Sequence, residues 1–196
     1  GVIADFVAAA KAKGDSHKMA GAQSKDSDEL LTKLIDKAAG TKMIYVPFKS
    51  GSEADTQLSG GHVDSHVNNP SESVGNWRAG RVRPLCVFNP GRLAAGPKVT
   101  ADKGWADIPS CKDSGIAVDS FTQPRVVWMP GKVPAEAAKF YVDLMKKVSE
   151  TPEWKEYIDR TSQTARYMGG ADFKAYVDKD HTRMQAVFAE QGWLVK

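Results

Sequence analysis

The sequence has few cysteines and no long apolar run. Only two cysteines, Cys86 and Cys111, occur among the 196 residues. They do not form a Cys-X-X-Cys pair, which argues against a structural zinc site. No run of about 18 apolar residues occurs, so the sequence predicts no membrane-spanning helix within it. The cysteines leave two alternatives open: a disulfide in an exported protein, or two buried thiols in a cytosolic one.

Motifs of the common enzyme classes are also missing. The sequence has no Gly-X-Ser-X-Gly nucleophile elbow, no phosphate-binding P-loop and no Gly-X-Gly-X-X-Gly turn after a strand. Its 27 basic residues are spread along the chain among 24 acidic ones. Such mixing is typical of a solvated surface rather than of a stripe that binds nucleic acid. We therefore expect no enzyme, no catalytic residue, no cofactor and no nucleic-acid partner.

Short apolar segments alternate with helical ones in the first half of the chain. Strands are predicted at residues 17–22, 42–48, 62–67 and 82–88, and the helical segments end at Gly14, Gly40, Gly60 and Gly80. This alternation predicts an α/β fold with a largely parallel sheet flanked by helices.

The second half is predicted to differ from the first. A long loop rich in glycine and proline, with a short helix near residues 110–114, leads to an extended segment at residues 121–134. Helices are expected at residues 135–148, 151–160 and 170–191, with a short strand at 164–168. The sequence therefore predicts a C-terminal helical extension.

Two histidines four residues apart, His62 and His66, look at first like metal ligands. However, Val63, Ser65 and Val67 alternate with polar residues, which is the period of a strand. On a strand the two histidines would lie about 13 Å apart, whereas zinc needs both ring nitrogens within about 2.1 Å. We therefore expect no metal site, and expect both histidines to be exposed or at the rim of a half-buried strand.

Polar residues gather where three of the predicted strands end and helices begin. In open parallel sheets ligands bind beyond the carboxyl ends of the strands. The helix starts there offer amide groups and a partial positive charge, which favour anions. The alternative is that these residues are ordinary helix caps. The candidate anion-binding residues are Ser24, Lys25 and Ser27 after the first strand, Ser52 after the second, and Asn68 and Asn69 after the third.

Several stretches resemble a known receptor family. They include "YVPFKSGSEADTQLSGGHVDSHVNNPSE" and "DIPSCKDSGI", and they are similar to segments of the substrate-binding receptors of tripartite tricarboxylate transporters, also called Bug receptors. The resemblance covers essentially the whole chain. It implies a periplasmic protein with two lobes of the type II periplasmic-binding-protein kind, closing like a Venus flytrap. Such a receptor captures a small organic carboxylate, needs no cofactor, and delivers its ligand to membrane transporter subunits.

The resemblance also implies how the chain is divided. Residues 1–122 correspond to the second lobe, and residues 123–196 to the crossover strand and C-terminal helices that belong largely to the first lobe. We expect Trp128, in the crossover, to line the cleft between lobes. Most of the first lobe would precede Gly1, so a homodimer is one expected arrangement. The alternatives are an interaction or assembly module, and a regulatory effector domain, neither binding a ligand by itself.

Overall fold

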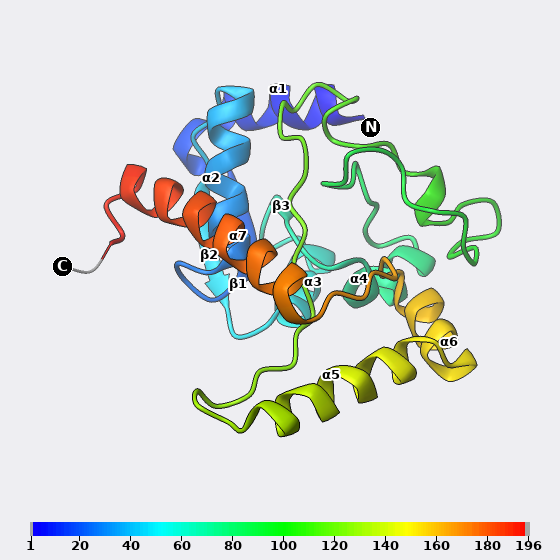
Figure 1. The fold of residues 1–196 in the computed structure, drawn as a ribbon. Helices are drawn as coiled ribbons and strands as arrows, with labels where there is room; N and C mark the ends of the chain where they lie inside the picture. The colour runs from blue at the N-terminus through cyan, green and yellow to red at the C-terminus, as the bar shows by residue number, and fades with distance from the viewer. Residues whose placement is uncertain (1, 195–196) are drawn as a thin grey trace. The chain divides into compact units, whose positions relative to one another are not determined.

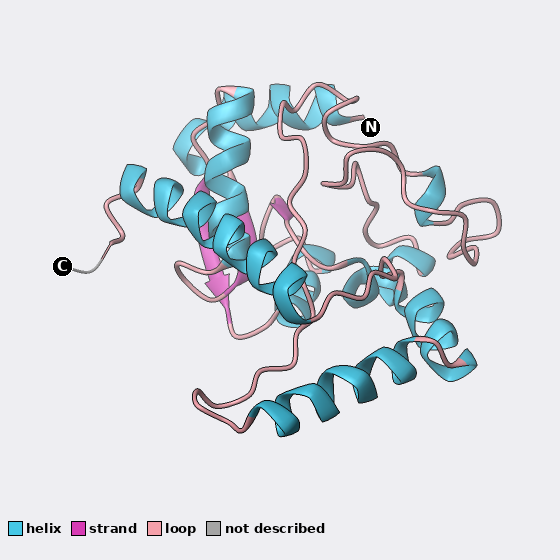
Figure 2. Cartoon of the chain, viewed as in Figure 1, coloured by secondary structure: helices cyan, strands magenta, loops and turns pink. Residues whose placement is uncertain are grey.

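The computed structural model describes residues 2–194 and divides into two compact units between Gln123 and Pro124. The first unit contains α1 (Ile3–Lys13), η1 (Gly14–Ser16), β1 (Lys18–Ala22), α2 (Ser27–Ala39), β2 (Ile44–Phe48), α3 (Gly51–Ser59), β3 (Ser65–His66), α4 (Pro70–Arg78) and η2 (Trp105–Asp107). The second contains α5 (Ala135–Ser149), α6 (Pro152–Thr161) and α7 (Gly170–Glu190). Figure 1 labels the α-helices and the strands, and Figure 2 separates helices, strands and loops by colour.

The sheet of the first unit is parallel, with the strand order β2-β1-β3. Residues Lys18–Ala22 of β1 pair with Ile44–Phe48 of β2, and Met19 and Ala20 pair with Ser65 and His66 of β3. Because all three strands run the same way, their carboxyl ends lie at one edge. The α/β class with a parallel sheet flanked by helices is confirmed.

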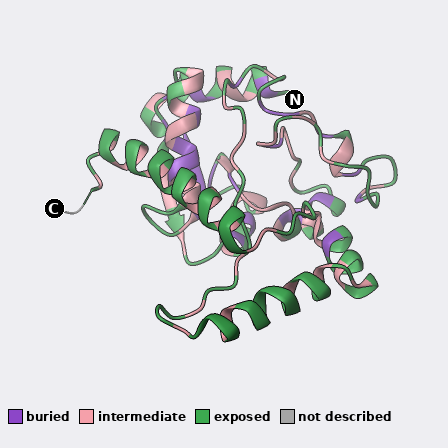
Figure 3. Ribbon diagram, viewed as in Figure 1, coloured by how far each residue is buried: buried purple, intermediate pink, exposed green. Residues whose placement is uncertain are grey.

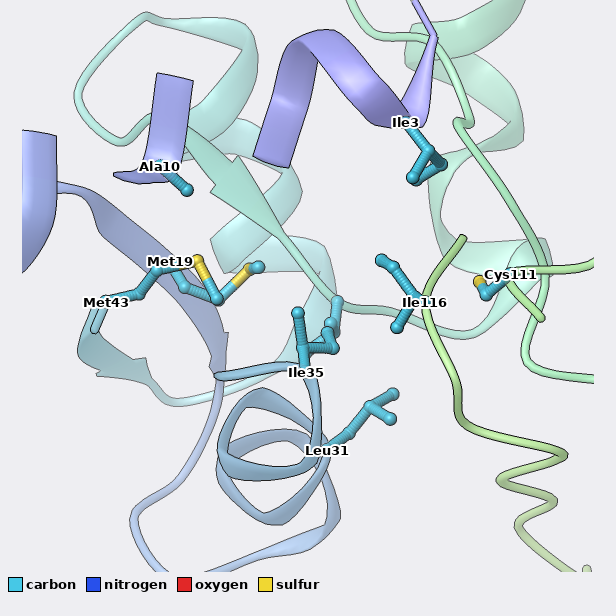
Figure 4. Packing of buried hydrophobic residues seen from close by; sticks show 9 residues of the cluster. Ile3, Ala10, Met19, Leu31, Ile35, Met43, Cys111 and Ile116 are labelled. Atoms are coloured by element: carbon cyan, nitrogen blue, oxygen red, sulfur yellow. The ribbon is translucent and has the colours of Figure 1, made fainter. Parts of the chain in front are cut away.

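One apolar cluster joins the helices to the sheet. Figure 4 shows Leu31 and Ile35 on α2 pointing toward Ile116, with Ile3 from α1 approaching the same side chain. The buried members are Ile3, Ala10, Met19, Leu31, Ile35, Met43, Val67, Cys111 and Ile116. Segments from both ends of the first unit therefore share a single core.

The predicted strand at residues 82–88 is wrong. Only Val87 bridges in parallel to Ser110, and the rest of that segment is loop. Pro84 has no N–H group with which to continue a ladder, which is one reason why the segment does not pair. The loop covers a small second core formed by Trp77, Val87, Val99 and Ile108. Residues 111–115 form turns instead of the expected helix, and residues 164–168 are loop instead of a strand.

A disulfide settles the question that the sequence left open. Cys86 and Cys111 are bonded across a sequence separation of 25 residues. Cys111 is fully buried in the main core, and Cys86 packs against it from the loop. The bond therefore joins two segments of the long loop after α4, and the second of these packs in the main core.

The second unit is built from helices and buries little of its own apolar surface. Of its described residues, Ile158 alone is buried. Trp128 is 67% exposed, although its ring lies 5.5 Å from that of Phe173, and Phe140 on α5 is 61% exposed. Figure 3 shows α5 and α7 largely as exposed surface. Across the described part of the chain, none of the helices is both long and apolar enough to cross a membrane.

A buried histidine lies at the opposite edge of the sheet from the carboxyl ends. His17 is 3% exposed, and its Nε2 lies 2.9 Å from Ser65 Oγ. Its Nδ1 is buried without a hydrogen-bond partner among the described residues. Ser65 Oγ in turn donates to Met19 Sδ, so an Nε2–H tautomer of His17 fits this chain of contacts best. A second ring proton would have no acceptor.

We predict that loss of the disulfide destabilises the first unit by roughly 3 kcal/mol, because closing a loop of this length restricts the unfolded chain. The double variant Cys86→Ser/Cys111→Ser should unfold at a lower urea concentration than the wild type. Dithiothreitol should shift the wild-type midpoint toward that of the variant and leave the variant unchanged. A wild-type midpoint that does not respond to complete reduction would contradict the prediction.

Acid should destabilise the fold through His17. Burial lowers the pKa of His17 below its ordinary value of 6.5, with Asp64 opposing the shift. Below about pH 6.5, His17 binds a proton in the unfolded chain but stays unprotonated in the folded chain. The free energy of unfolding therefore decreases as the pH is lowered. Urea midpoints at about pH 7.5 and 5.5 should differ less in His17→Gln than in the wild type. An equal difference in both proteins would remove His17 as a cause.

Candidate functional site at the carboxyl edge of the sheet

The junction between β1 and α2 holds the first three candidate residues. Ser24 and Lys25 are exposed, and Lys25 has a positive φ of 58°. Glu29 accepts hydrogen bonds from Ser24 Oγ (3.1 Å) and from the backbone N–H of Lys25 (2.6 Å). The backbone N–H of Ser27, the first residue of α2, donates to Asp26 Oδ1 at 2.7 Å. The loop amides and hydroxyl that we expected to be free are thus bound by acidic side chains of the chain itself.

The junction between β2 and α3 repeats this arrangement. Ser50 caps α3 by accepting from the backbone N–H of Glu53 (3.2 Å), and Glu53 accepts from the backbone N–H of Lys49 (3.0 Å). Ser52 is exposed and is not the cap. A surface hollow of about 530 Å³ lies at this junction. It is lined by Gln23, Pro47, Phe48, Lys49 and Glu53.

At the third junction, Asn68 joins the starts of two helices. Its Nδ2 donates to the carbonyl of Gly51 at the start of α3 (3.1 Å), and its Oδ1 accepts from the backbone N–H of Asn69 at 2.9 Å. Asn69 occupies the N-cap position of α4, where its side chain makes no capping bond and donates instead to Glu72 Oε2 (3.1 Å). Asn68 therefore acts in this structure as a clamp between α3 and α4.

His66 corrects the expectation that both histidines are exposed or at the rim. His62 is exposed, but the His66 side chain is only 10% exposed. Its Nε2 lies 3.2 Å from Asp55 Oδ1, and Asp55 comes from α3 with 4% of its side chain exposed. The sequence did not indicate this pair, because Asp55 approaches His66 only once α3 packs on the sheet.

Acidic groups dominate the charge of this edge. Burial raises the pKa of Asp28 above its ordinary value, although the backbone N–H of Ala22 donates to it at 2.8 Å and opposes the shift. Asp26 and Glu72 add to the increase. Burial also raises the pKa of Tyr45, whose hydroxyl donates to the carbonyl of Ala22 at 2.7 Å. An anionic ligand would find its attractive charges mainly in the lysines of the loops.

The six candidate residues therefore lie at one edge of the sheet, but they do not line a common binding surface. None of the six candidate residues lines the hollow, but Gln23 adjoins Ser24 in sequence, and Glu53 adjoins Ser52. Lys49 and Gln23 are the residues that sequence reasoning missed. The lysine follows a strand and precedes a helix, which was the signal used for Lys25. Within residues 2–194 no group of three His, Cys, Asp or Glu residues is arranged to hold a metal ion.

Comparison with known proteins links this fold to one family. The family model described as tripartite tricarboxylate transporter family receptor matches residues 2–193. A curated relative from Cupriavidus necator, described as a UPF0065 protein in the gbd 5′ region, is 22% identical over 192 residues. That match covers 96% of this chain and 54% of the relative, so the chain spans about half of the relative's length.

Two solved structures share the fold. A TctC solute binding protein from Polaromonas superposes with a TM-score of 0.73 at 20% identity, over 97% of this chain and 62% of that protein. The R. palustris protein Rpa4515, solved with adipate, gives a TM-score of 0.78 at 18% identity, over 97% and 61%. At these identities the similarity establishes the architecture alone.

We predict that Gly51→Ala breaks the clamp at the start of α3. A Cβ atom on residue 51 would collide with Asn68 Oδ1 and come within 2.8 Å of Glu72 Oε2. We expect a loss of about 1–3 kcal/mol in the free energy of unfolding, together with shifted NMR signals of the Asn68 side-chain amide.

Gly75→Ala is the matched control for this variant. Gly75 lies within α4, and a Cβ there meets nothing within 4 Å. Because alanine favours a helix over glycine, this variant should be as stable as the wild type or more so. If Gly51→Ala proves as stable as Gly75→Ala, the clamp does not constrain the fold.

Proposed function

The chain belongs to the tripartite tricarboxylate transporter receptor family, and from that premise we propose that it is the ligand-binding part of a periplasmic receptor for a small organic carboxylate. The family is one of receptors rather than enzymes. The observation that carries the proposal is the convergence of three strand ends and three helix starts on one edge of a parallel sheet. Parallel sheets receive their ligands at such an edge.

The chemistry of the edge supports a carboxylate held by the loops. Lys25 and Lys49 are exposed cations in the loops that precede α2 and α3. The Gln23 side chain and the Ser24 hydroxyl add hydrogen-bond donors nearby. A ligand carboxylate would compete with Glu29 and Glu53 for the loop amides. The adipate bound to the R. palustris relative has the kind of charged end group that such loops would hold.

We propose that residues 1–122 form the second lobe of this receptor, and that residues 123–196 belong largely to the first. The ligand would pass to membrane transporter subunits, and a homodimer stays a proposed assembly. Trp128, exposed beside Phe173, stays a candidate for the cleft lining. The six candidate contacts stay proposals: Ser24, Lys25, Ser27, Ser52, Asn68 and Asn69.

A second candidate function is an assembly module that binds no ligand by itself. The chain spans only 54–62% of the relatives described above. In the second unit, Phe140, Tyr141 and Leu144 of α5 are large apolar side chains that are 61%, 46% and 37% exposed. Such a surface favours contact with further polypeptide.

Calorimetric titration with mono-, di- and tricarboxylates tests the receptor proposal. We expect heat of binding with at least one organic acid, and a loss in affinity of about fivefold for Lys25→Gln, Ser24→Ala and Asn68→Ala, the equivalent of an ordinary hydrogen bond each. Lys42→Gln is the matched control, because Lys42 is exposed ahead of β2 at the opposite edge.

The outcomes separate the two candidate functions. Binding that is weakened by the edge variants and unaffected by Lys42→Gln supports the receptor and its site. Binding with unchanged affinity in all three edge variants removes these residues from the site. If no organic acid binds, the assembly module becomes the better description of this chain.

A further inference from the structure

A buried polar network lies directly behind the proposed binding edge. Asp55 of α3, His66 of β3 and Ser73 of α4 contribute its centre, with Asn68 at its outer end. Asn76 of α4 donates to Asp55 Oδ2. Asp55 is 3% exposed and Ser73 is 7% exposed. Since polar groups this deeply buried are costly unless paired, the network needs a defined arrangement of protons.

The contacts of His66 Nε2 conflict with one another. This atom lies 3.2 Å from Asp55 Oδ1, 3.2 Å from Ser73 Oγ and 3.4 Å from Asn68 Nδ2. A carboxylate oxygen requires a proton on Nε2, whereas the Asn68 amide, itself a donor, requires a lone pair there. One protonation state of the ring cannot satisfy both neighbours.

Each state of His66 therefore favours a different arrangement. When the neutral ring carries its proton on Nδ1, Nε2 has a lone pair, and Asn68 Nδ2 can donate to it while it also donates to the Gly51 carbonyl. Asp55 Oδ1 is then left buried without a hydrogen bond, as it is in this structure. With a protonated Nε2, Asp55 gains its partner, and the N–H groups of Asn68 and His66 repel each other.

We infer that the His66–Asp55 pair is a proton-controlled device that positions the Asn68 amide, and with it the joint start of α3 and α4. On protonation of His66 the Asn68 amide turns away and releases Gly51. His66 is thus a positioning residue for the edge, acting through Asn68. The inference depends on the proposed function only in treating this edge as the binding site.

The surroundings of His66 place its titration in the acidic range. Burial lowers its pKa below the ordinary 6.5, while Asp55 from α3 and Glu72 from α4 act in the opposite direction. On the sheet side His66 pairs with Ala20 of β1, which brings no charge. The neutral ring therefore prevails at neutral pH, and it accepts from Asn68 when its proton is on Nδ1. Acidification places protons on both ring nitrogens, and so on Nε2.

The test is an NMR titration of the ¹⁵N-labelled chain between about pH 7.5 and 4.5, a range that contains the histidine transitions. The side-chain amide signals of Asn68 are identified by their loss in Asn68→Ser. We expect them to shift with the midpoint of the His66 ring, below 6.5. No ligand is added, so failure to bind any carboxylate would sink the proposed function without affecting this readout.

Two variants make the titration decisive. His66→Gln should abolish the pH-dependent shift of Asn68, whereas His62→Gln, which removes an exposed histidine of the same segment, should preserve it. Asn68 signals that stay fixed while His66 titrates would overturn the inference, as would a shift that persists in His66→Gln. Should His66→Gln fail to fold, the wild-type titration still tests the inference. The Asn68 signals should then shift with the midpoint of His66, and a shift that follows His62 instead would overturn it.

Discussion

The absence of a side chain at residue 21 is the constraint on which the carboxyl edge of the sheet depends. A Cβ atom on Gly21 would lie 2.5 Å from the Tyr45 hydroxyl and 2.6 Å from Asp28 Cβ. Without it, β2 and the start of α2 both close on β1, so that Tyr45 donates to Ala22 and Ala22 donates to Asp28. The position of the α2 start therefore follows from one glycine in the central strand.

Internal carboxylates also determine the electrostatics of the loops at this edge. Glu29 and Glu53 bind the backbone N–H groups of Lys25 and Lys49, so carboxylates of the chain itself hold both loops. A ligand carboxylate adds binding energy only to the extent that it binds these donors better than the internal carboxylates do. If the edge binds a carboxylate as proposed, its affinity should depend on Lys25 and Lys49, whose ammonium groups carry charge that the amides lack.

The parts of the structure that local chemistry determines were predictable from the sequence. Gly40 ends α2 in the left-handed conformation, as the pattern indicated, and α6 begins at Pro152, within one residue of the predicted start. The failures depend on contacts between distant residues. The strand expected at residues 82–88 is replaced by one bridge and a disulfide. His66 is buried because α3 brings Asp55 to it, which no pattern along one strand reveals.

The two units differ in how completely each buries its own apolar surface. The first unit contains a continuous core and a disulfide, together with all six candidate residues. The second leaves Trp128 and Phe140 more than half exposed and buries Ile158 alone among its described residues. The second unit's own residues therefore cover its apolar side chains less completely than those of the first unit do. Under the two proposed functions, changes at the edge of the sheet should alter ligand recognition by the first unit, whereas changes on α5 should alter assembly.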